Sequence, residues 1–265
     1  MNPTVVAAVI AAAASVLTLV GTLAAQHFGR RATNEDTEKA FAEQRRQLDE
    51  TLKAQSEQLD RTLNEQRTRT WNERAATAAE QLGSDNVKPA AVRLAGVYAM
   101  AGLADDWEAN RQTCVDVLCA YLRMPYEPDP GPDGSMLEQL AVQSSREVRH
   151  TVIRVITAHL KDDTKVSWQG LNFDFTGVVF DGGDFTSAVF SGGTIDFRFA
   201  RFSGSTVDFG GADFSGGTAD FSHAGFSGGT VDFSEVDDWS SPPTFTWADT
   251  PPPGVKLPDT GGKAS

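Results

Sequence analysis

The side chains most able to do chemistry in this sequence are its histidines and cysteines, and their spacing argues against a shared site. His150 and His159 stand nine residues apart in a segment expected to be helical, so they fall on nearly opposite faces, whereas a shared metal ion needs a spacing of four. Cys114 and Cys119 are five residues apart and do not meet on one helix face either. The remaining histidines stand alone: His27 and His223. We therefore expect core cysteines and no metal site.

The sequence carries no fingerprint of catalysis or of cofactor binding. No G-x-S-x-G nucleophile motif, P-loop or dinucleotide-binding glycine motif occurs. The repeated Phe-Ser-Gly-Gly tetrads are rich in glycine, but no lysine occurs between residues 166 and 255 to meet a phosphate. The many aspartates do not follow the calcium β-roll pattern. We therefore predict a protein that is not an enzyme, with no catalytic residue, no cofactor and no metal.

The balance of charge excludes a further class of function. The chain has 265 residues, with 23 Lys and Arg against 36 Asp and Glu, and its formal net charge is −13. A general nucleic-acid binder needs a basic face to displace counterions from phosphates. We therefore expect no nucleic-acid partner.

The amino terminus is typical of a membrane anchor. Residues 4–25 contain no charged side chain, and as a helix they would span roughly 33 Å, enough to cross a hydrocarbon core of about 30 Å. Arg30 and Arg31 follow directly and no basic residue precedes them, so the positive-inside rule places the bulk of the chain in the cytoplasm and the amino terminus outside. We predict a single-pass anchor in the cell membrane over residues 1–29. A cleaved signal peptide is the alternative.

The next segment, residues 30–71, is expected to form a charged helical stalk. It contains no Pro or Gly, and an 11-residue repeat is visible in QLDETLKAQSE (47–57) and QLDRTLNEQRT (58–68). The repeat places four leucines on one narrow stripe, namely Leu48, Leu52, Leu59 and Leu63. A period of about 3.67 residues per turn favours a straight or slightly right-handed coiled coil. The stalk either forms a homo-oligomer through this stripe or remains a single solvated helix.

Residues 72–163 read as a small helical module with a linker at 126–135. Gly83 is expected to end one helix, Pro89 to begin the next, and the pattern Ser135-x-x-Glu138 to cap a later one. The segment that starts at Val148-Arg149 repeats the pattern of the segment that starts at Val92-Arg93, in which a Val-Arg pair is followed by apolar residues at the same spacing. The echo indicates two copies of a HEAT-like helical unit.

Residues 164–238 carry a phenylalanine repeat that predicts a β-solenoid. Thirteen of the 16 Phe lie between residues 173 and 233, first spaced by five and then alternately by seven and five. No single unit can bury its Phe, whereas stacked turns of chain build a continuous column. The expected column consists of Phe180, Phe185, Phe190, Phe197, Phe202, Phe209, Phe214, Phe221, Phe226 and Phe233. Beyond it, residues 239–265 form a Pro-rich tail, expected to be irregular, whose Trp239, Phe245 or Trp247 would cover the last coil.

The repeat resembles the pentapeptide-repeat family, whose pattern is A(D/N)(L/F)XX. The matching segments are LNFDF, TGVVF, DGGDF and TSAVF. The resemblance implies a right-handed quadrilateral β-helix with one pentapeptide per side. The spacing beyond Phe190 departs from five, so we expect each coil there to consist of two seven-plus-five units, longer than four pentapeptides, and about three coils in all. The predicted fold class is therefore mixed, with separate all-α and all-β parts.

A wider resemblance covers most of residues 70–240. The chain is similar to membrane-anchored pentapeptide-repeat proteins of actinobacteria, which combine an apolar amino-terminal helix with a segment of the type R-x3-A-x2-QLG…VRL-G-(I/V)YA(L/M). The matching residues are Arg74, Ala78, Gln81-Leu82-Gly83, Val92-Arg93-Leu94, Gly96-Val97-Tyr98-Ala99-Met100 and 117–123. This resemblance implies no assigned activity.

Two functions follow as expectations. The first is a non-enzymatic, membrane-tethered cytoplasmic scaffold whose solenoid or helical module binds another protein. The alternative is an acidic DNA mimic that inhibits or protects a DNA-binding enzyme such as gyrase, as in the proteins this repeat resembles. Residues 168–237 hold ten acidic and two basic side chains, which is the correct sign for a mimic.

Overall fold

The computed structural model describes residues 34–83, 89–128, 131, 134–247 and 250–259. The chain divides into two compact units, residues 1–66 and 67–265. The predicted membrane anchor, residues 1–29, lies outside the described residues. Within the described ranges, no helix combines the length and the apolar character needed to cross a membrane.

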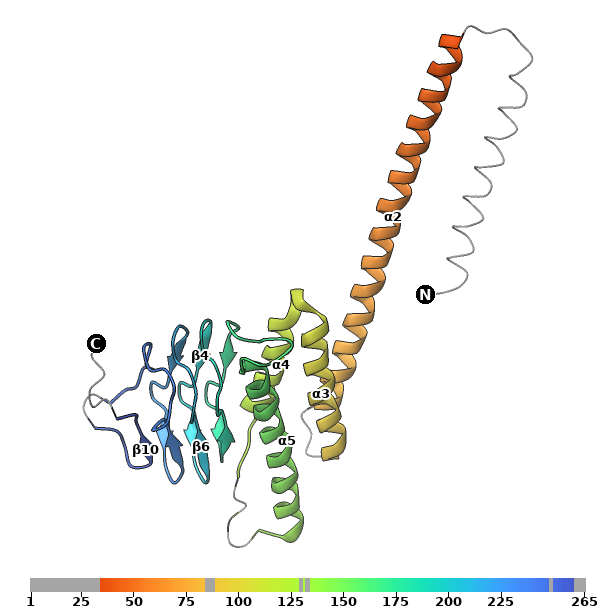
Figure 1. Cartoon of the computed structure of the whole chain (residues 1–265). Helices are drawn as coiled ribbons and strands as arrows, with labels where there is room; N and C mark the ends of the chain where they lie inside the picture. Colours follow the sequence, from red (N-terminus) through yellow and green to blue (C-terminus); the bar gives the residue numbers. More distant parts are fainter. Residues whose placement is uncertain (1–33, 84–88, 129–130, 132–133, 248–249, 260–265) are drawn as a thin grey trace. The chain divides into compact units, whose positions relative to one another are not determined.

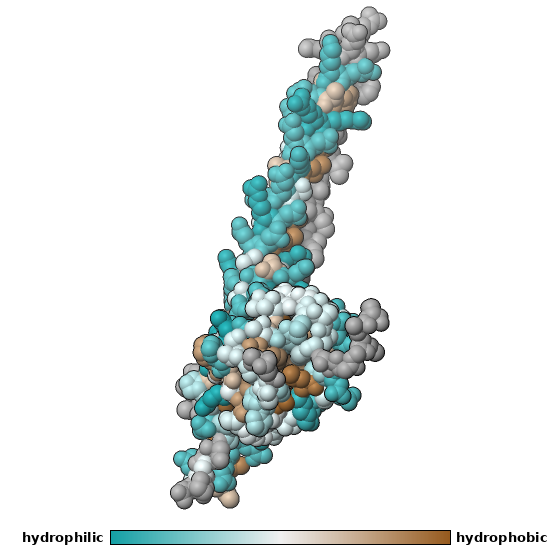
Figure 2. Space-filling view, turned by 90° about the vertical axis from the view of Figure 1, so that its left-hand side faces the viewer, coloured by the Kyte–Doolittle hydropathy of each residue, from teal (hydrophilic) through white to brown (hydrophobic). Residues whose placement is uncertain are grey.

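The predicted stalk is helical. Helix α2 (Asn34–Leu82) runs for 49 residues without interruption and ends at Gly83, as the sequence predicts. The leucines of the 11-residue repeat are exposed along it, and 54% of the surface of Leu52 is accessible. Figure 2 shows small hydrophobic patches on an otherwise hydrophilic helix. The structure of the single chain does not show a coiled coil.

Three further helices form the helical module. They are α3 (Ala90–Asp106), α4 (Arg111–Arg123), which follows a 3-10 turn at Glu108–Asn110, and α5 (Met136–Leu160) (Figure 1). Pro89 occupies the N-cap of α3, and Ser135 and Glu138 form the predicted capping box of α5. Helix α3 packs against α4 and α5, with Val97, Leu118 and Val152 among the fully buried side chains.

Gly96 allows α3 to approach the end of α2 closely. A Cβ atom at this position would lie 2.7 Å from the amide nitrogen of Leu82 and 3.0 Å from the carbonyl oxygen of Ala78. Ala78 and Leu82 are themselves buried. A side chain at Gly96 would therefore force the two backbones apart.

Residues 173–256 form a parallel β-solenoid of about three turns. Short strands stack on three of its faces (Figure 1). One face holds β1 (Phe173–Asp174), β4 (Thr194–Asp196) and β7 (Thr218–Asp220); the second holds β2 (Val179–Phe180), β5 (Arg201–Phe202) and β8 (Gly225–Phe226); the third holds β3 (Gly183–Asp184), β6 (Thr206–Asp208), β9 (Thr230–Asp232) and β10 (Val255–Lys256). Isolated parallel bridges from Val189 to Asp213 and from Asp213 to Asp238 mark a fourth line of pairing.

The strand register explains the two spacings of Phe in the sequence. Phe173 pairs with Ile195, and the coil that joins them is shorter than the later ones. Val207 pairs with Gly183 on one side and with Val231 on the other, so each of these coils holds two seven-plus-five units, as expected. The pairing also runs past residue 238, because β10 pairs with β9.

The phenylalanines fill the interior of the coils. Nine of the ten residues of the expected column are buried, and the tenth, Phe226, is half-buried. Rings at equivalent positions of successive coils stack almost parallel, as Phe185 does on Phe209 at 5.1 Å between centroids and Phe202 on Phe226 at 5.2 Å. Offset stacks at such distances stabilise a core beyond the area they bury.

The corners between faces demand unusual backbone conformations. Gly193 has a φ of +70°, and a Cβ atom there would overlap the carbonyl oxygen of Leu171 in the coil before. Two residues with side chains, Phe199 and His223, hold φ values of 58° and 61° at equivalent corners of successive coils, and their rings stack at 5.2 Å. Unlike the column residues, Phe199 is 57% exposed.

Both ends of the solenoid are covered. At the first coil, Gln112 on α4 exchanges hydrogen bonds with the backbone of Asn172, and Thr157 on α5 donates one to the carbonyl of Asp184. At the last coil, Trp239 packs on Phe233 and Phe245 packs on Phe221. Figure 2 looks onto this end, where pale coils surround a small hydrophobic area. The helices and the tail thus cover strand edges that would otherwise offer unpaired backbone groups.

Candidate functional site

The residues singled out for chemistry occupy separate places in the fold. His150 contacts Asp181, whereas His159 stacks on Trp168 and approaches Asp105. Within the described part of the chain, no group of three or more His, Cys, Asp or Glu residues is placed to hold a metal ion. His27 lies outside the described residues, and His223 lies at a solenoid corner.

The two cysteines are core residues. Cys114 and Cys119 are both buried among the helices and form no disulfide. Burial raises the pKa of the Cys114 thiol, and burial together with the nearby Asp116 carboxylate raises the pKa of Cys119 to about 12. Both side chains are therefore neutral thiols at neutral pH, and neither is an activated nucleophile.

The repeated aspartates perform one structural task. In eight places an Asp Oδ1 accepts a hydrogen bond from the backbone N–H two residues later, at 2.7–3.0 Å. These residues are Asp174, Asp184, Asp196, Asp208, Asp213, Asp220, Asp232 and Asp238. Such Asx turns begin the corners of the coils. The regular spacing of Asp is thus explained by the corners and requires no ligand.

Asp181 departs from that pattern. Its side chain is buried, and it binds Tyr126 Oη at 2.7 Å, His150 Nε2 at 2.9 Å and Arg146 Nε at 3.1 Å. Burial by itself raises the pKa of the carboxyl group, but hydrogen bonds from His150 and Tyr126, with the charge of Arg146, outweigh burial and lower the pKa below its ordinary value. An ionised carboxylate thus joins α5 and the linker after α4 to the first coil.

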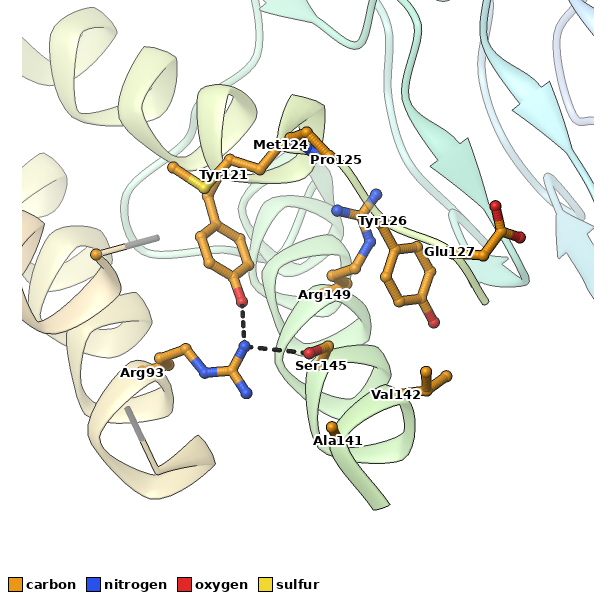
Figure 3. Close-up of a pocket in the computed structure, with 11 residues that line it drawn as sticks. Arg93, Tyr121, Met124, Pro125, Tyr126, Glu127, Ala141, Val142, Ser145 and Arg149 are labelled. Atoms are coloured by element: carbon orange, nitrogen blue, oxygen red, sulfur yellow. Dashed lines mark hydrogen bonds between the residues drawn. The ribbon is translucent and has the colours of Figure 1, made fainter. Parts of the chain in front are cut away.

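A pocket of about 210 Å³ lies among α3, α4, α5 and the residues that follow α4. Figure 3 shows Arg93 from α3, Tyr121 from α4 and Ser145 from α5 directed toward one another. A terminal nitrogen of Arg93 lies 3.3 Å from both Tyr121 Oη and Ser145 Oγ. Ala141, one helical turn before Ser145 on α5, is exposed and also lines the pocket.

A second arginine, Arg149 of α5, lines the same pocket. It donates a hydrogen bond to the carbonyl oxygen of Val179 at 3.0 Å, and its guanidinium carbon lies 4.4 Å from the centre of the Tyr126 ring. Burial lowers the pKa of Arg149, because removal from water disfavours the charged form. Two buried guanidinium groups in one pocket of an acidic chain can hold an anion.

The sequence carries a signal for this pair, although it does not by itself indicate a site. Arg93 and Arg149 occupy the same position in the two segments that echo each other. Taken alone, the echo indicates only a structural repeat. A basic residue at the same position of both copies, in helices that pack on each other, indicates a shared location.

No protein-family model, curated protein or solved structure matches this chain.

Proposed function

We propose that this chain is a non-enzymatic, membrane-tethered cytoplasmic scaffold that displays a short β-solenoid to a protein partner. The observation that carries the proposal is that the repeated Phe and Asp side chains are used to build the solenoid. The Phe rings fill the column, and the Asp carboxylates bind the corner amides. What the solenoid offers to other molecules is therefore a rigid, repetitive outer surface.

The tether is supported by the sequence of residues 4–25. This uncharged stretch is long enough to cross a bilayer, and Arg30 and Arg31 follow it. The proposed location is the cell membrane, with the amino terminus outside and the bulk of the chain in the cytoplasm.

We propose that the solenoid is a shortened, right-handed pentapeptide-repeat β-helix and that the helical module derives from HEAT-like units. The five-residue spacing of Phe180, Phe185 and Phe190 and the four lines of strand pairing support the first part. The DNA-mimic alternative gains no support, since the Asp spacing is explained by corner turns.

The stalk is proposed to join copies of the chain. Its apolar stripe is exposed along α2, where Leu52 and Leu59 are 54% and 41% accessible. Burying such a stripe against a second copy removes apolar surface from water. The 11-residue period keeps the stripe on one side of the helix over the two repeats.

Charge placed on the stripe is expected to separate the copies. In the full chain purified in mild detergent, we expect Leu52→Lys combined with Leu59→Lys to convert an oligomer into a monomer, measured by sedimentation velocity. The matched control adds the same two charges off the stripe, with Gln47→Lys and Ala54→Lys, and is expected to remain oligomeric. A monomeric wild-type chain, or a stripe variant that stays oligomeric, would show that the stalk is a solvated single helix.

A further inference from the structure

We propose that the pocket among α3, α4 and α5 binds a small phosphate-type oxyanion, either free phosphate or the phosphate end of an ester. This inference goes beyond the scaffold function and does not depend on it. It rests on the placement of Arg93, on the second arginine beside it, and on the directions from which their donors enter the pocket.

Arg93 is a buried cation whose hydrogen bonds are incomplete. Only 5% of its surface is accessible, and its two partners, Tyr121 and Ser145, are neutral hydroxyl groups. Its Nε has no hydrogen-bond partner among the described residues, but this atom is closed to water, so a ligand in the pocket would meet the terminal nitrogens of Arg93. A buried guanidinium whose partners are neutral is costly, so an anion that reaches its terminal nitrogens from the pocket would be stabilised.

Arg149 adds a second guanidinium group that forms no ion pair of its own among the described residues, although the charge of the Asp181 carboxylate acts on it from beyond Tyr126. Its partners are the carbonyl of Val179 and the ring of Tyr126. In the described ranges, no ion pair joins either arginine to a carboxylate. Glu127, the acidic residue in the lining, is exposed and is drawn at the outer side of the pocket in Figure 3. Among the described residues that line the pocket, two guanidinium groups therefore stand against one exposed carboxylate.

The arrangement of donors favours a tetrahedral anion. Arg93 comes from α3 and Arg149 from α5, and Tyr121 of α4 places its hydroxyl group beside Arg93 (Figure 3). Donors that approach from several directions match the oxygens of a phosphate better than the single plane of a carboxylate. The volume of about 210 Å³ is large enough for a phosphate ion together with ordered water.

Binding is tested with the full chain in mild detergent by isothermal titration calorimetry, using inorganic phosphate and, in a parallel arm, methyl phosphate. We expect saturable binding by the wild-type chain. Arg93→Gln removes the incomplete guanidinium, and Ala141→Trp places a large side chain in the pocket lining while leaving both arginines in place. Both changes are expected to weaken binding at least tenfold. The control is Arg111→Gln on α4, which lies outside the lining and is expected to bind like the wild type.

The titrations with phosphate and with methyl phosphate distinguish a free ion from the end of an ester. If methyl phosphate binds as well as phosphate, the ligand is the end of a larger ester; if it binds more than tenfold more weakly, the ligand is the free ion, and either result supports the site. Ala141 is exposed, so the Ala141→Trp variant is expected to fold. It therefore tests binding in the pocket even if Arg93→Gln does not fold. Absence of saturable binding, or equal binding by the wild type and Ala141→Trp, would overturn the proposal.

Discussion

Replacing Phe209 with alanine is expected to cost about 3–5 kcal/mol of folding free energy, the range for a fully buried aromatic residue. Phe209 has no accessible surface and lies at the centre of the column. Its ring stacks on Phe185 at 5.1 Å and on Phe233 at 4.6 Å, and it meets Phe221 edge-on at 6.1 Å. The cavity would therefore open between three successive coils, which depend on one another for burial.

Phe199→Ala is the matched control for this prediction. The same side chain is removed from the same solenoid, but Phe199 is exposed and its described ring contact is with His223. We expect a loss of no more than about 1 kcal/mol. Urea unfolding of the full-length variants, followed by circular dichroism, measures both values. Equal destabilisation by the two substitutions would contradict a buried phenylalanine column.

Asp181→Asn is expected to destabilise the protein by about 2–4 kcal/mol at pH 7, because it neutralises a buried carboxylate that three side chains hold. Arg146 and His150 would lose their anionic partner, and Tyr126 would face an amide. The network joins the helices to the first coil. Its loss would weaken the contact between the helices and the first coil, while the hydrogen bonds of Gln112 and Thr157 to that coil remain.

The pH dependence of this effect has a definite sign. The pKa of Asp181 is lowered in the folded protein, so its contribution is present above the unfolded pKa of about 3.9 and is lost as the pH falls through the lower folded pKa. Urea unfolding at a series of pH values should therefore show the gap between wild type and Asp181→Asn closing at acid pH. The control, Asp213→Asn, keeps an oxygen for the N–H of Ser215 and should change stability by less than about 0.5 kcal/mol. A gap that does not depend on pH would show that Asp181 is not held as an anion.

Local patterns in the sequence were sufficient to predict much of the fold. The spacing of Phe predicted the solenoid and the length of its later coils, because a column forms only when equivalent residues recur once per coil. Gly83, Pro89 and the Ser135–Glu138 pair marked helix ends correctly, since capping depends on neighbours within a few residues. These features require no knowledge of distant contacts.

The contacts between distant segments were not predictable in the same way. Asp181 looks like one more acidic residue of the repeat, yet its partners lie 31 to 55 residues away in the chain. Arg93 likewise meets Ser145 across 52 residues. The hydrogen-bond partners of buried polar groups depend on how the helices and coils pack. The periodicity of the sequence does not indicate them. The candidate pocket became visible only with the folded helices.

The exposed corner residue Phe199 shows a second limit. Phe199 follows Phe197 by two residues and is not part of the expected column, but the spacing did not indicate the conformation that it adopts. The left-handed conformation at Phe199 turns its side chain outward. Pattern alone does not predict which residue adopts that conformation when a side chain replaces glycine.

Proximity labelling in native membranes tests the proposed scaffold function most directly. A biotin ligase fused to the carboxyl terminus of the full chain is compared with the same ligase fused after residue 82, which keeps the anchor and α2 but lacks the module and the solenoid. The proposal predicts biotinylated cytoplasmic proteins in both samples, with a reproducible subset labelled only by the full chain. Identical labelled sets, or labelling confined to proteins outside the cytoplasm, would contradict a cytoplasmic scaffold whose folded part binds a partner.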